Sequence, residues 1–454
     1  MTAETDPRIA EAKRLLLEVA AERRRRLTGV RPADPARAEC YRETLERFAE
    51  HRGGRLFHPY LGSGAGAGAL VELADGSVKL DMVGGIGVHV LGHGDPALVE
   101  AGVESALRDV VMQGNLQQNV ESAAIAAQLV TIARESAARL DHCFLTSSGA
   151  MANENALKIL FQARAPADRL LALDGCFAGR TMALAAITDE PAYREGLPRA
   201  LSVDYVPFFD PRDARVSTVR AVEVLERHLS RYPGRHAAMV FELVQGEGGF
   251  RPGRRDYFVA VMEALRGHGV PVFIDEIQTF GRSTRWFAFQ HFGLEQYVDV
   301  VTIGKMTQVC ATLFSDTVKP RPGLLSQTFT GSTSAILAAA AILDRLGAGG
   351  FFGEDGRIAR IHARFASQFE GIAKRNAERF GPGVYGWGLG GMIAFEVDGG
   401  DLAATKQFLR RLFDAGVVAY YAGSSPARVR FLPPLGAITD GDVDLACEIV
   451  ERSL

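Results

Sequence analysis

The chain alternates short apolar runs with longer stretches in which apolar residues recur every three or four positions, the pattern of a sheet covered by helices. Val270–Ile274 and Val298–Ile303 are apolar runs bounded by turn or charged residues, which predicts buried parallel strands. A helical stretch over 257–266, ended by glycines, joins the first run to another over 237–244. This strand–helix–strand unit predicts an α/β fold with a right-handed crossover.

Both predicted strands lead into residues that can do chemistry. Asp275 ends the first, and Lys305 follows the second through Gly304. Because ligands of open α/β sheets bind beyond the carboxyl ends of the strands, both groups are expected in one crevice. Pyridoxal phosphate needs such a pair, a lysine that forms the Schiff base and a carboxylate that keeps the pyridine nitrogen protonated. A strand-end salt bridge explains the same two residues equally well.

A third strand, predicted over 143–145, is followed by hydroxyl-bearing and small residues at the start of a helix over 151–163. The free N–H groups of a helix start, with nearby hydroxyls, form an anion site. Ser148, Gly149 and Ala150 are therefore expected to hold a phosphate next to Lys305. The alternative is that Ser148 is an ordinary helix cap.

The run from Asp275 to Arg282, together with Gly304-Lys305, resembles the signature of class III, fold type I, pyridoxal phosphate-dependent aminotransferases. The resemblance covers most of the chain from about Gly84 to Pro434. It implies an α/β large domain whose mostly parallel, seven-stranded sheet is flanked by helices, and a smaller α+β domain. It further implies pyridoxal 5′-phosphate as cofactor, Lys305 and Asp275 as catalytic residues, and a homodimer or a dimer of dimers.

The same resemblance assigns further residues to the site. It implies that Phe177 stacks on the pyridine ring, Gln278 contacts the phenolic oxygen and Thr328 reaches the phosphate bound by the partner subunit; cofactor-binding residues are then Ser148, Gly149, Ala150, Phe177, Glu242, Asp275, Gln278, Lys305 and Thr328. Arg180 and Arg430 are the candidates for substrate carboxylates, and Glu247 resembles the movable counter-ion of Arg430. Alternatively, Phe177 is core, Arg180 is a surface charge, and Glu247 with Arg430 is a fixed salt bridge.

The run Lys305–Cys310, KMTQVC, looks most like the lysine 6-aminotransferase branch. It predicts ping-pong transfer of the ω-amino group of lysine, ornithine or 4-aminobutyrate to a keto acid such as 2-oxoglutarate. Departures from the family pattern leave the substrate less defined than the cofactor: these are Leu243 for proline, Ala178 for histidine or tryptophan, Met151 for glutamate, Thr330-Gly331-Ser332 for Gly-Gly-Asn, and a turn over 278–282 that is about one residue short.

Other functions remain compatible with these residues. A racemase, aminomutase or decarboxylase on the same fold keeps Lys305 and Asp275 but forms no stable amino form of the cofactor. A cofactor-free binding protein takes up no pyridoxal phosphate. The glycine-rich stretch 62–68 imitates a dinucleotide fingerprint, but hairpin patterning follows it where that fingerprint requires a helix.

At 454 residues the chain predicts several domains, divided as a helical arm over 1–55, the start of a small domain over 56–100, a large cofactor domain over 101–346 and a C-terminal small domain over 347–454. The net charge of -3 favours neither nucleic acid nor membrane. Five cysteines without a C-x-x-C pair, and no H-E-x-x-H, predict no metal site. Without a signal-like segment or an 18-residue apolar run, a cytoplasmic location is expected.

Overall fold

The computed structural model describes residues 6–108 and 112–454, which form two compact units. The large unit consists of Arg108–Ala359 and Val384–Met392. The small unit consists of the described residues up to Leu107, together with Arg360–Gly383 and Ile393–Leu454. The segments predicted as N-terminal arm and start of the small domain therefore belong to one unit with most of the C-terminal segment.

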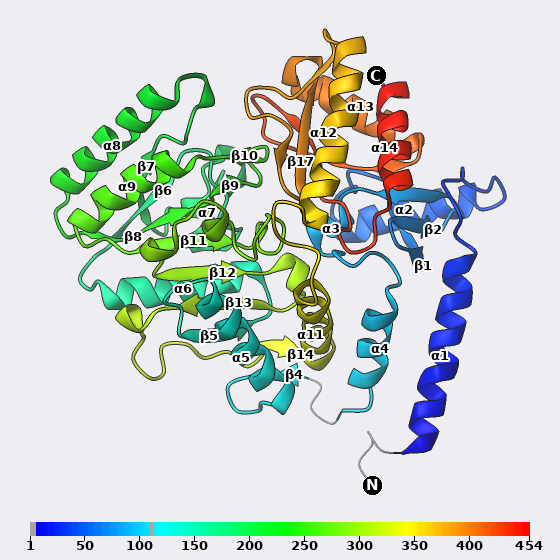
Figure 1. The fold of residues 1–454 in the computed structure, drawn as a ribbon, viewed down its shortest axis with the longest axis horizontal. Helices are drawn as coiled ribbons and strands as arrows, with labels where there is room; N and C mark the ends of the chain where they lie inside the picture. The colour runs from blue at the N-terminus through cyan, green and yellow to red at the C-terminus, as the bar shows by residue number, and fades with distance from the viewer. Residues whose placement is uncertain (1–5, 109–111) are drawn as a thin grey trace. The chain divides into compact units, whose positions relative to one another are not determined.

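A seven-stranded sheet forms the centre of the large unit (Figure 1). Its strands, in spatial order, are β5 (His142–Thr146), β13 (Cys310–Phe314), β12 (Val300–Ile303), β11 (Val272–Glu276), β8 (His236–Phe241), β6 (Arg169–Leu173) and β7 (Ser202–Val206). Only β13 runs antiparallel to its neighbours, because the short turn over 305–309 returns the chain directly beside β12. The predicted, mostly parallel sheet is confirmed.

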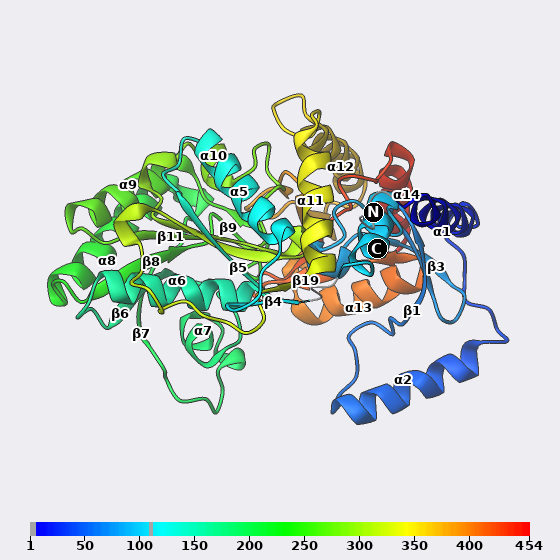
Figure 2. The same cartoon turned by 90° about the horizontal axis from the view of Figure 1, so that it is seen from below.

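Helices cover both faces of this sheet, with α6 and α9 on opposite sides (Figure 2). The helices of the large unit are α5 (Val120–Glu135), α6 (Gly149–Ala163), α7 (Met182–Ile187), α8 (Ala214–Arg231), α9 (Arg255–Gly267), α10 (Ala288–His291) and α11 (Thr333–Gly347). Its short strands are β4 (Met112–Gln113), β9 (Val244–Gln245), β10 (Arg251–Pro252), β14 (Gly331–Ser332) and β16 (Gly388–Leu389). Helix α6 packs along β12 and β13 through small buried residues such as Ala152 and Ala156.

Strand β11 extends beyond the apolar run that predicted it. Asp275 and Glu276 lie inside the strand, opposite Thr302 and Ile303 of β12. Since successive side chains of a strand point to opposite faces, the two acids are separated by the sheet. Glu276 turns away from the cleft described below and accepts N–H bonds from Ala288 and Phe289 at the start of α10.

The small unit holds two sheets. One has the order β1 (Gly62–Ala67), β2 (Leu70–Leu73), β3 (Val78–Asp81) and β18 (Val417–Val418); the other contains β15 (Phe380–Gly381), β17 (Met392–Val397), β20 (Arg428–Phe431) and β19 (Tyr420–Ala422). Its helices are α1 (Pro7–Arg25), α2 (Ala38–Arg52), α3 (Gly84–Gly87), α4 (Pro96–Ser105), α12 (Arg357–Arg375, from Arg360 on), α13 (Leu402–Asp414) and α14 (Asp440–Arg452).

The structure shows what two glycine-containing segments, 62–68 and 383–389, form. The glycine-rich stretch is strand β1, which pairs antiparallel with β2, so it opens no phosphate-binding helix. In the segment over 383–389, only Gly388–Leu389 is extended, because Gly383 and Gly386 take left-handed φ angles of 61° and 66° that interrupt a strand.

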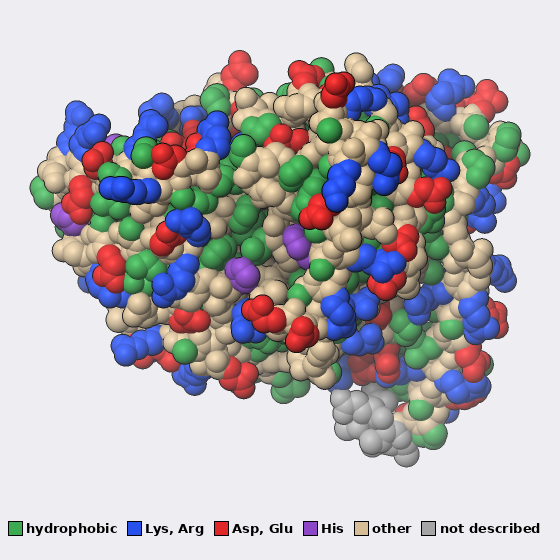
Figure 3. All heavy atoms as spheres, turned by 45° about the horizontal axis from the view of Figure 1, so that its top comes forward, with side chains coloured by type: hydrophobic (Ala, Val, Ile, Leu, Met, Phe, Trp, Pro, Cys, Tyr) green, Lys and Arg blue, Asp and Glu red, His purple; other side chains and the backbone are tan. Residues whose placement is uncertain are grey.

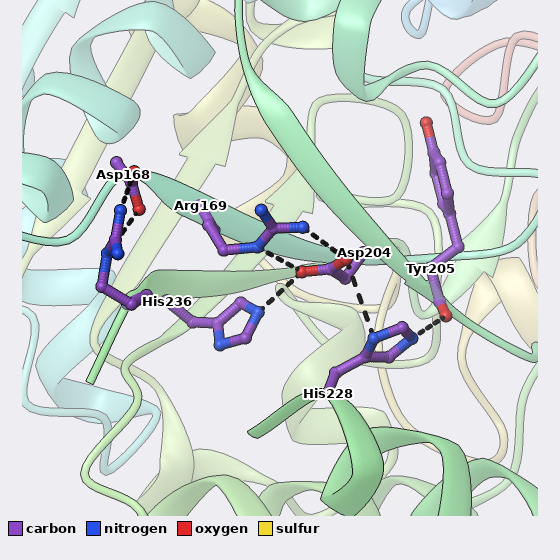
Figure 4. A network of polar contacts seen from close by, with 7 residues as sticks. Asp168, Arg169, Asp204, Tyr205, His228 and His236 are labelled. Atoms are coloured by element: carbon purple, nitrogen blue, oxygen red, sulfur yellow. Dashed lines mark hydrogen bonds and ion pairs between the residues drawn. The ribbon is translucent and has the colours of Figure 1, made fainter. Parts of the chain in front are cut away.

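A polar network lies at the start of β6 and β8, away from the cleft (Figure 4). Asp204 accepts two hydrogen bonds from the Arg169 guanidinium at 2.7 Å and one from His236 Nε2 at 2.9 Å. Burial disfavours the charged form of Asp204, but these donors outweigh it and hold its pKa below the ordinary value. The network therefore anchors the edge strand β7 to its neighbours.

Positive and negative side chains are interspersed on the face shown in Figure 3. Within the described residues, no helix is long and apolar enough to cross a membrane. Across 6–108 and 112–454, no group of three or more histidine, cysteine, aspartate or glutamate side chains is arranged to hold a metal ion.

Candidate active site

A cleft of about 310 Å³ opens in the large unit beyond the carboxyl ends of β8, β11 and β12. It is lined by Gly149, Ala150, Asn153, Phe177, Ala178, Gly179, Arg180, Glu242, Val244, Gly246, Glu247, Asp275, Ile277, Gln278, Thr279 and Lys305. Nine of the residues singled out from the sequence are in this set: Lys305, Asp275, Gly149, Ala150, Phe177, Glu242, Gln278, Arg180 and Glu247.

Lys305 enters the cleft from a strained turn. Its φ of 51° is in the left-handed region, as is the φ of 60° at Gln308, and such conformations cost energy and persist only where the surroundings enforce them. Gly304 lets the turn pack closely on β13, because a Cβ at position 304 would lie 2.7 Å from Cys310 Sγ.

Asp275 is buried, yet both carboxylate oxygens have donors. The Ile277 N–H donates to Oδ1 at 2.9 Å and Asn153 Nδ2 donates to Oδ2 at 2.6 Å. Burial raises the pKa of Asp275, while the two donors and Lys305 oppose the rise. The pKa of Asp275 is therefore raised overall, but by less than burial alone would raise it.

Glu242 lines the same cleft with a different electrostatic balance. Burial, followed by repulsion from Asp275, raises its pKa to about 8 although the N–H groups of Phe177 and Gly246 donate to it at 2.7 and 3.0 Å. Burial therefore favours the neutral form of Glu242 near neutral pH. Glu242 also ties the Phe177 turn to the end of β8.

The turn after β6 carries an aromatic ring and a guanidinium into the cleft. Phe177 packs edge-to-face on Tyr193, with ring centroids 6.2 Å apart. Arg180 is exposed, and its guanidinium carbon lies 3.5 Å from the Tyr193 centroid. A cation held over an aromatic ring keeps its N–H edge available to an anion.

The family model for class III aminotransferases matches residues 58–454. The chain belongs to the class III aminotransferase family. The acetylornithine aminotransferases of Archaeoglobus fulgidus and Corynebacterium efficiens are 32% and 31% identical to it; they align over 85% and 83% of this chain and over 93% and 88% of their own lengths.

Solved structures show the same fold. The lysine aminotransferase of M. tuberculosis superposes with a TM-score of 0.81 at 24% identity, covering 90% of this chain and 99% of that one. The ornithine aminotransferase of Toxoplasma gondii gives 0.75 at 23% identity, covering 91% and 97%. This class III aminotransferase is accordingly a fold type I enzyme, and its cofactor is pyridoxal 5′-phosphate.

The cleft of the aminotransferase fits that cofactor. Gln278 Oε1 is buried at the cleft without a hydrogen-bond partner, an arrangement suited to a side-chain amide that meets a ligand. A Cβ at Gly246 would lie 2.5 Å from Gln278 Oε1, and one at Gly149 would lie 2.9 Å from Ile277, so a larger residue at either position would displace a side chain that lines the cleft. An amine, a carboxylate and a helix start facing one cleft match the aldehyde, ring nitrogen and phosphate.

Three predicted residues are not among those that line the cleft. Ser148 accepts the Met151 N–H at 3.2 Å, so it caps α6, and a further contact with phosphate stays a prediction. Thr328 is exposed in the loop before β14. Arg430 is fully buried in β20 of the small unit. Their roles toward the partner's cofactor and the substrate stay predictions.

Sequence reasoning missed Asn153 and Tyr193. Asn153 is a buried amide in the middle of an otherwise apolar helix face, a signal that was available in the α6 pattern. Tyr193 is in a one-turn 3-10 helix, Pro191–Tyr193, where no motif marks it. Its contact with Arg180 depends on the tertiary path of the loop.

Proposed function

We propose that this aminotransferase takes the terminal amino group of a diamino acid, such as lysine, ornithine or acetylornithine, and transfers it to 2-oxoglutarate. The relatives named above act on such donors according to their names. The observation that carries the proposal is a guanidinium, Arg180, in the same cleft as Lys305 and Asp275. Arg180 would give the donor's carboxylate a partner while the distant amine reaches the cofactor carbon that Lys305 would hold.

When bound, pyridoxal phosphate supplies an aldehyde carbon that condenses with amines and a ring that withdraws electrons. Lys305 Nζ would hold the cofactor and, when free, would move the proton from the amine-bearing carbon to the cofactor's aldehyde carbon. Asp275 would stabilise the positive ring nitrogen. Phe177 would cover the ring, and the N–H groups at the start of α6 would bind the phosphate.

Two carboxylates of 2-oxoglutarate need two cations, which Arg180 and Arg430 supply. A diamino acid brings only one carboxylate to the site, so Arg430 needs a counter-ion during the first half-reaction. Glu247 lines the cleft and is partly buried, which supports this role. On this proposal Glu247 pairs with Arg430 for the donor and releases it for the acceptor.

A homodimer completes the proposed site. Met112, Leu116, Val120 and Phe329 of the large unit are 49%, 99%, 79% and 38% exposed. Gly114 and the backbone of Thr328 are in close contact, so this apolar patch surrounds the residue expected to reach the partner's phosphate. Exposed apolar patches of this kind typically mark an interface between proteins. A second copy of the chain is the proposed partner.

The test combines labelling with a substrate panel. Borohydride reduction of the purified, cofactor-loaded protein should attach the cofactor to Lys305 in peptide mapping. Lysine, ornithine, acetylornithine and 4-aminobutyrate are then offered with 2-oxoglutarate or pyruvate, and the spectrum of the amino form of the cofactor is followed. Label on another lysine refutes the site, whereas label on Lys305 with preference for α-amino donors refutes only the substrate class.

A further inference from the structure

Asn153 connects three parts of the site that are distant in the sequence. Its Nδ2 donates to Asp275 Oδ2 at 2.6 Å and to the Ala178 carbonyl at 2.7 Å. Its Oδ1 accepts the Thr302 hydroxyl at 2.7 Å. All four residues are buried, and Asn153 itself is only 2% exposed.

The orientation of the amide is decided by its neighbours. A backbone carbonyl can only accept, so the atom that faces Ala178 must be the nitrogen, and the other end must be the oxygen. Thr302 then donates to that oxygen. The amide therefore presents an N–H to Asp275 and cannot rotate without losing two buried hydrogen bonds.

The sheet explains why the contact exists. Thr302 and Asp275 are register partners on β12 and β11, so their side chains point to the same face. Helix α6 covers that face and is held close by the Thr312 hydroxyl, which donates to the Ala152 carbonyl at 2.8 Å. Asn153 is thereby delivered directly over the end of β11.

We propose that Asn153 is a positioning residue that keeps Asp275 ionised toward the cofactor's ring nitrogen and couples it to the turn that carries Phe177 and Arg180. An N–H donor favours the carboxylate over the neutral acid, because both oxygens of the carboxylate accept hydrogen bonds, whereas one oxygen of the acid carries a proton. The Ala178 bond fixes the turn by the same amide. This inference rests on the role of Asp275 in the proposed function.

Other charged groups near Asp275 act differently. The charge of Asp275 helps to raise the pKa of Glu242 at the end of β8, Lys305 opposes the rise that burial causes in the pKa of Asp275, and burial raises the pKa of the Cys310 thiol to about 11. Unlike these groups, Asn153 is a neutral amide in a fixed orientation, and it donates a hydrogen bond to Asp275 Oδ2. A neutral donor is effective whatever the charge of its neighbours.

The test is Asn153→Asp, which puts a second carboxylate beside Oδ2 without changing the shape of the side chain. Asn155→Asp is the matched control, because Asn155 is also 2% exposed on α6 but does not line the cleft. Three quantities are measured: the Kd of apo-protein for pyridoxal phosphate, the pH titration of the bound cofactor's absorbance, and the Tm of the apo-protein.

Asn153→Asp should raise the Kd at least ~10-fold and shift the absorbance titration by about one pH unit or more, because two adjacent carboxylates share a proton. Thr302→Val should shift the titration in the same direction by a smaller amount. Thr302→Ser keeps the hydroxyl that donates to Asn153, so its titration should match that of the unsubstituted protein. Asn155→Asp should lower Tm only. If the two asparagine variants lower Tm alike and leave both cofactor measurements unchanged, Asn153 is purely structural and the inference is wrong.

Asp275→Asn separates this failure from that of the proposed function. If it changes the absorbance titration while Asn153→Asp does not, only the role of Asn153 is overturned. If Asp275→Asn also leaves the titration unchanged, the assignment of Asp275 fails and the proposed function fails with it.

Discussion

The guanidinium of Arg180 lies over the ring of Tyr193 at 3.5 Å. We predict that Tyr193→Leu raises the KM for the amino donor roughly 3- to 30-fold with little change in kcat, the equivalent of losing a cation–π contact of about 0.5–2 kcal/mol. Tyr193→Phe keeps the ring and should restore the KM. Steady-state kinetics of both variants test this, and equal losses in kcat would show that the ring supports the chemistry instead.

Asp275→Asn should leave the cofactor bound but reduce turnover at least ~10³-fold, because a neutral amide cannot stabilise a positive ring nitrogen. Single-turnover mixing with the donor places the loss in the chemical step. Unchanged single-turnover rates would contradict the assignment. Glu276→Gln is the control: Glu276 faces away from the cleft, so the variant should alter Tm more than the chemical step.

Glu247 and Arg430 are expected to act as a gate between the two half-reactions. Glu247→Ala should shift donor preference toward α-amino acids such as glutamate. Arg430→Ala should raise the KM for 2-oxoglutarate at least ~10-fold, while the diamino donor is affected less, because truncating a bidentate guanidinium removes charge-assisted bonds. Arg430→Lys should recover part of the loss. Equal effects on both half-reactions would indicate a fixed salt bridge.

The apolar patch around Leu116 is predicted to join two copies of the chain. Leu116→Asp should produce monomers in sedimentation, since it buries an unpaired charge in the proposed interface. Val216→Asp is the matched control, because Val216 is 59% exposed on α8 outside the patch. Thr328→Ala should leave the dimer intact but weaken cofactor binding several-fold. A monomer with full activity would refute the shared site.

Acid should weaken the fold partly through Asp204. Because the pKa of Asp204 is lowered in the folded protein, its stabilisation is complete above its unfolded pKa of about 3.9 and is lost as pH falls through the folded value. Asp204→Asn should reduce the free energy of unfolding at pH 7 by about 2–4 kcal/mol, with a smaller difference below about pH 4.

The matched control for Asp204 is Asp168→Asn. Asp168 pairs with Arg235 at the surface, where both side chains are about half exposed, so its loss should change the free energy of unfolding little at any pH (Figure 4). Thermal unfolding of the three proteins from pH 3 to 8 measures both effects. A pH-independent deficit in Asp204→Asn would mean that the charge of Asp204 contributes little.

Much of the site is local in the chain and was therefore predictable. The apolar runs that lead to Asp275 and Lys305 predict buried strands, because a buried strand consists of consecutive apolar residues. Short motifs assign four further residues to the site, since each lies within a few residues of a strand end: Phe177, Arg180, Gln278 and Glu247. Helix boundaries for α6 and α9 also agree within a few residues with the structure, because caps and glycines are local signals.

The amino-acid sequence by itself determined the cofactor chemistry and the order of strands and helices along the chain. The tertiary structure alone decided the role of Glu276, which lies on the face of β11 opposite Asp275 and accepts N–H bonds from the start of α10, because those partners come from another element. It also brought Asn153 to Asp275 across 122 residues. Such contacts arise from packing between elements, so the periodicity of residues within one element does not predict them.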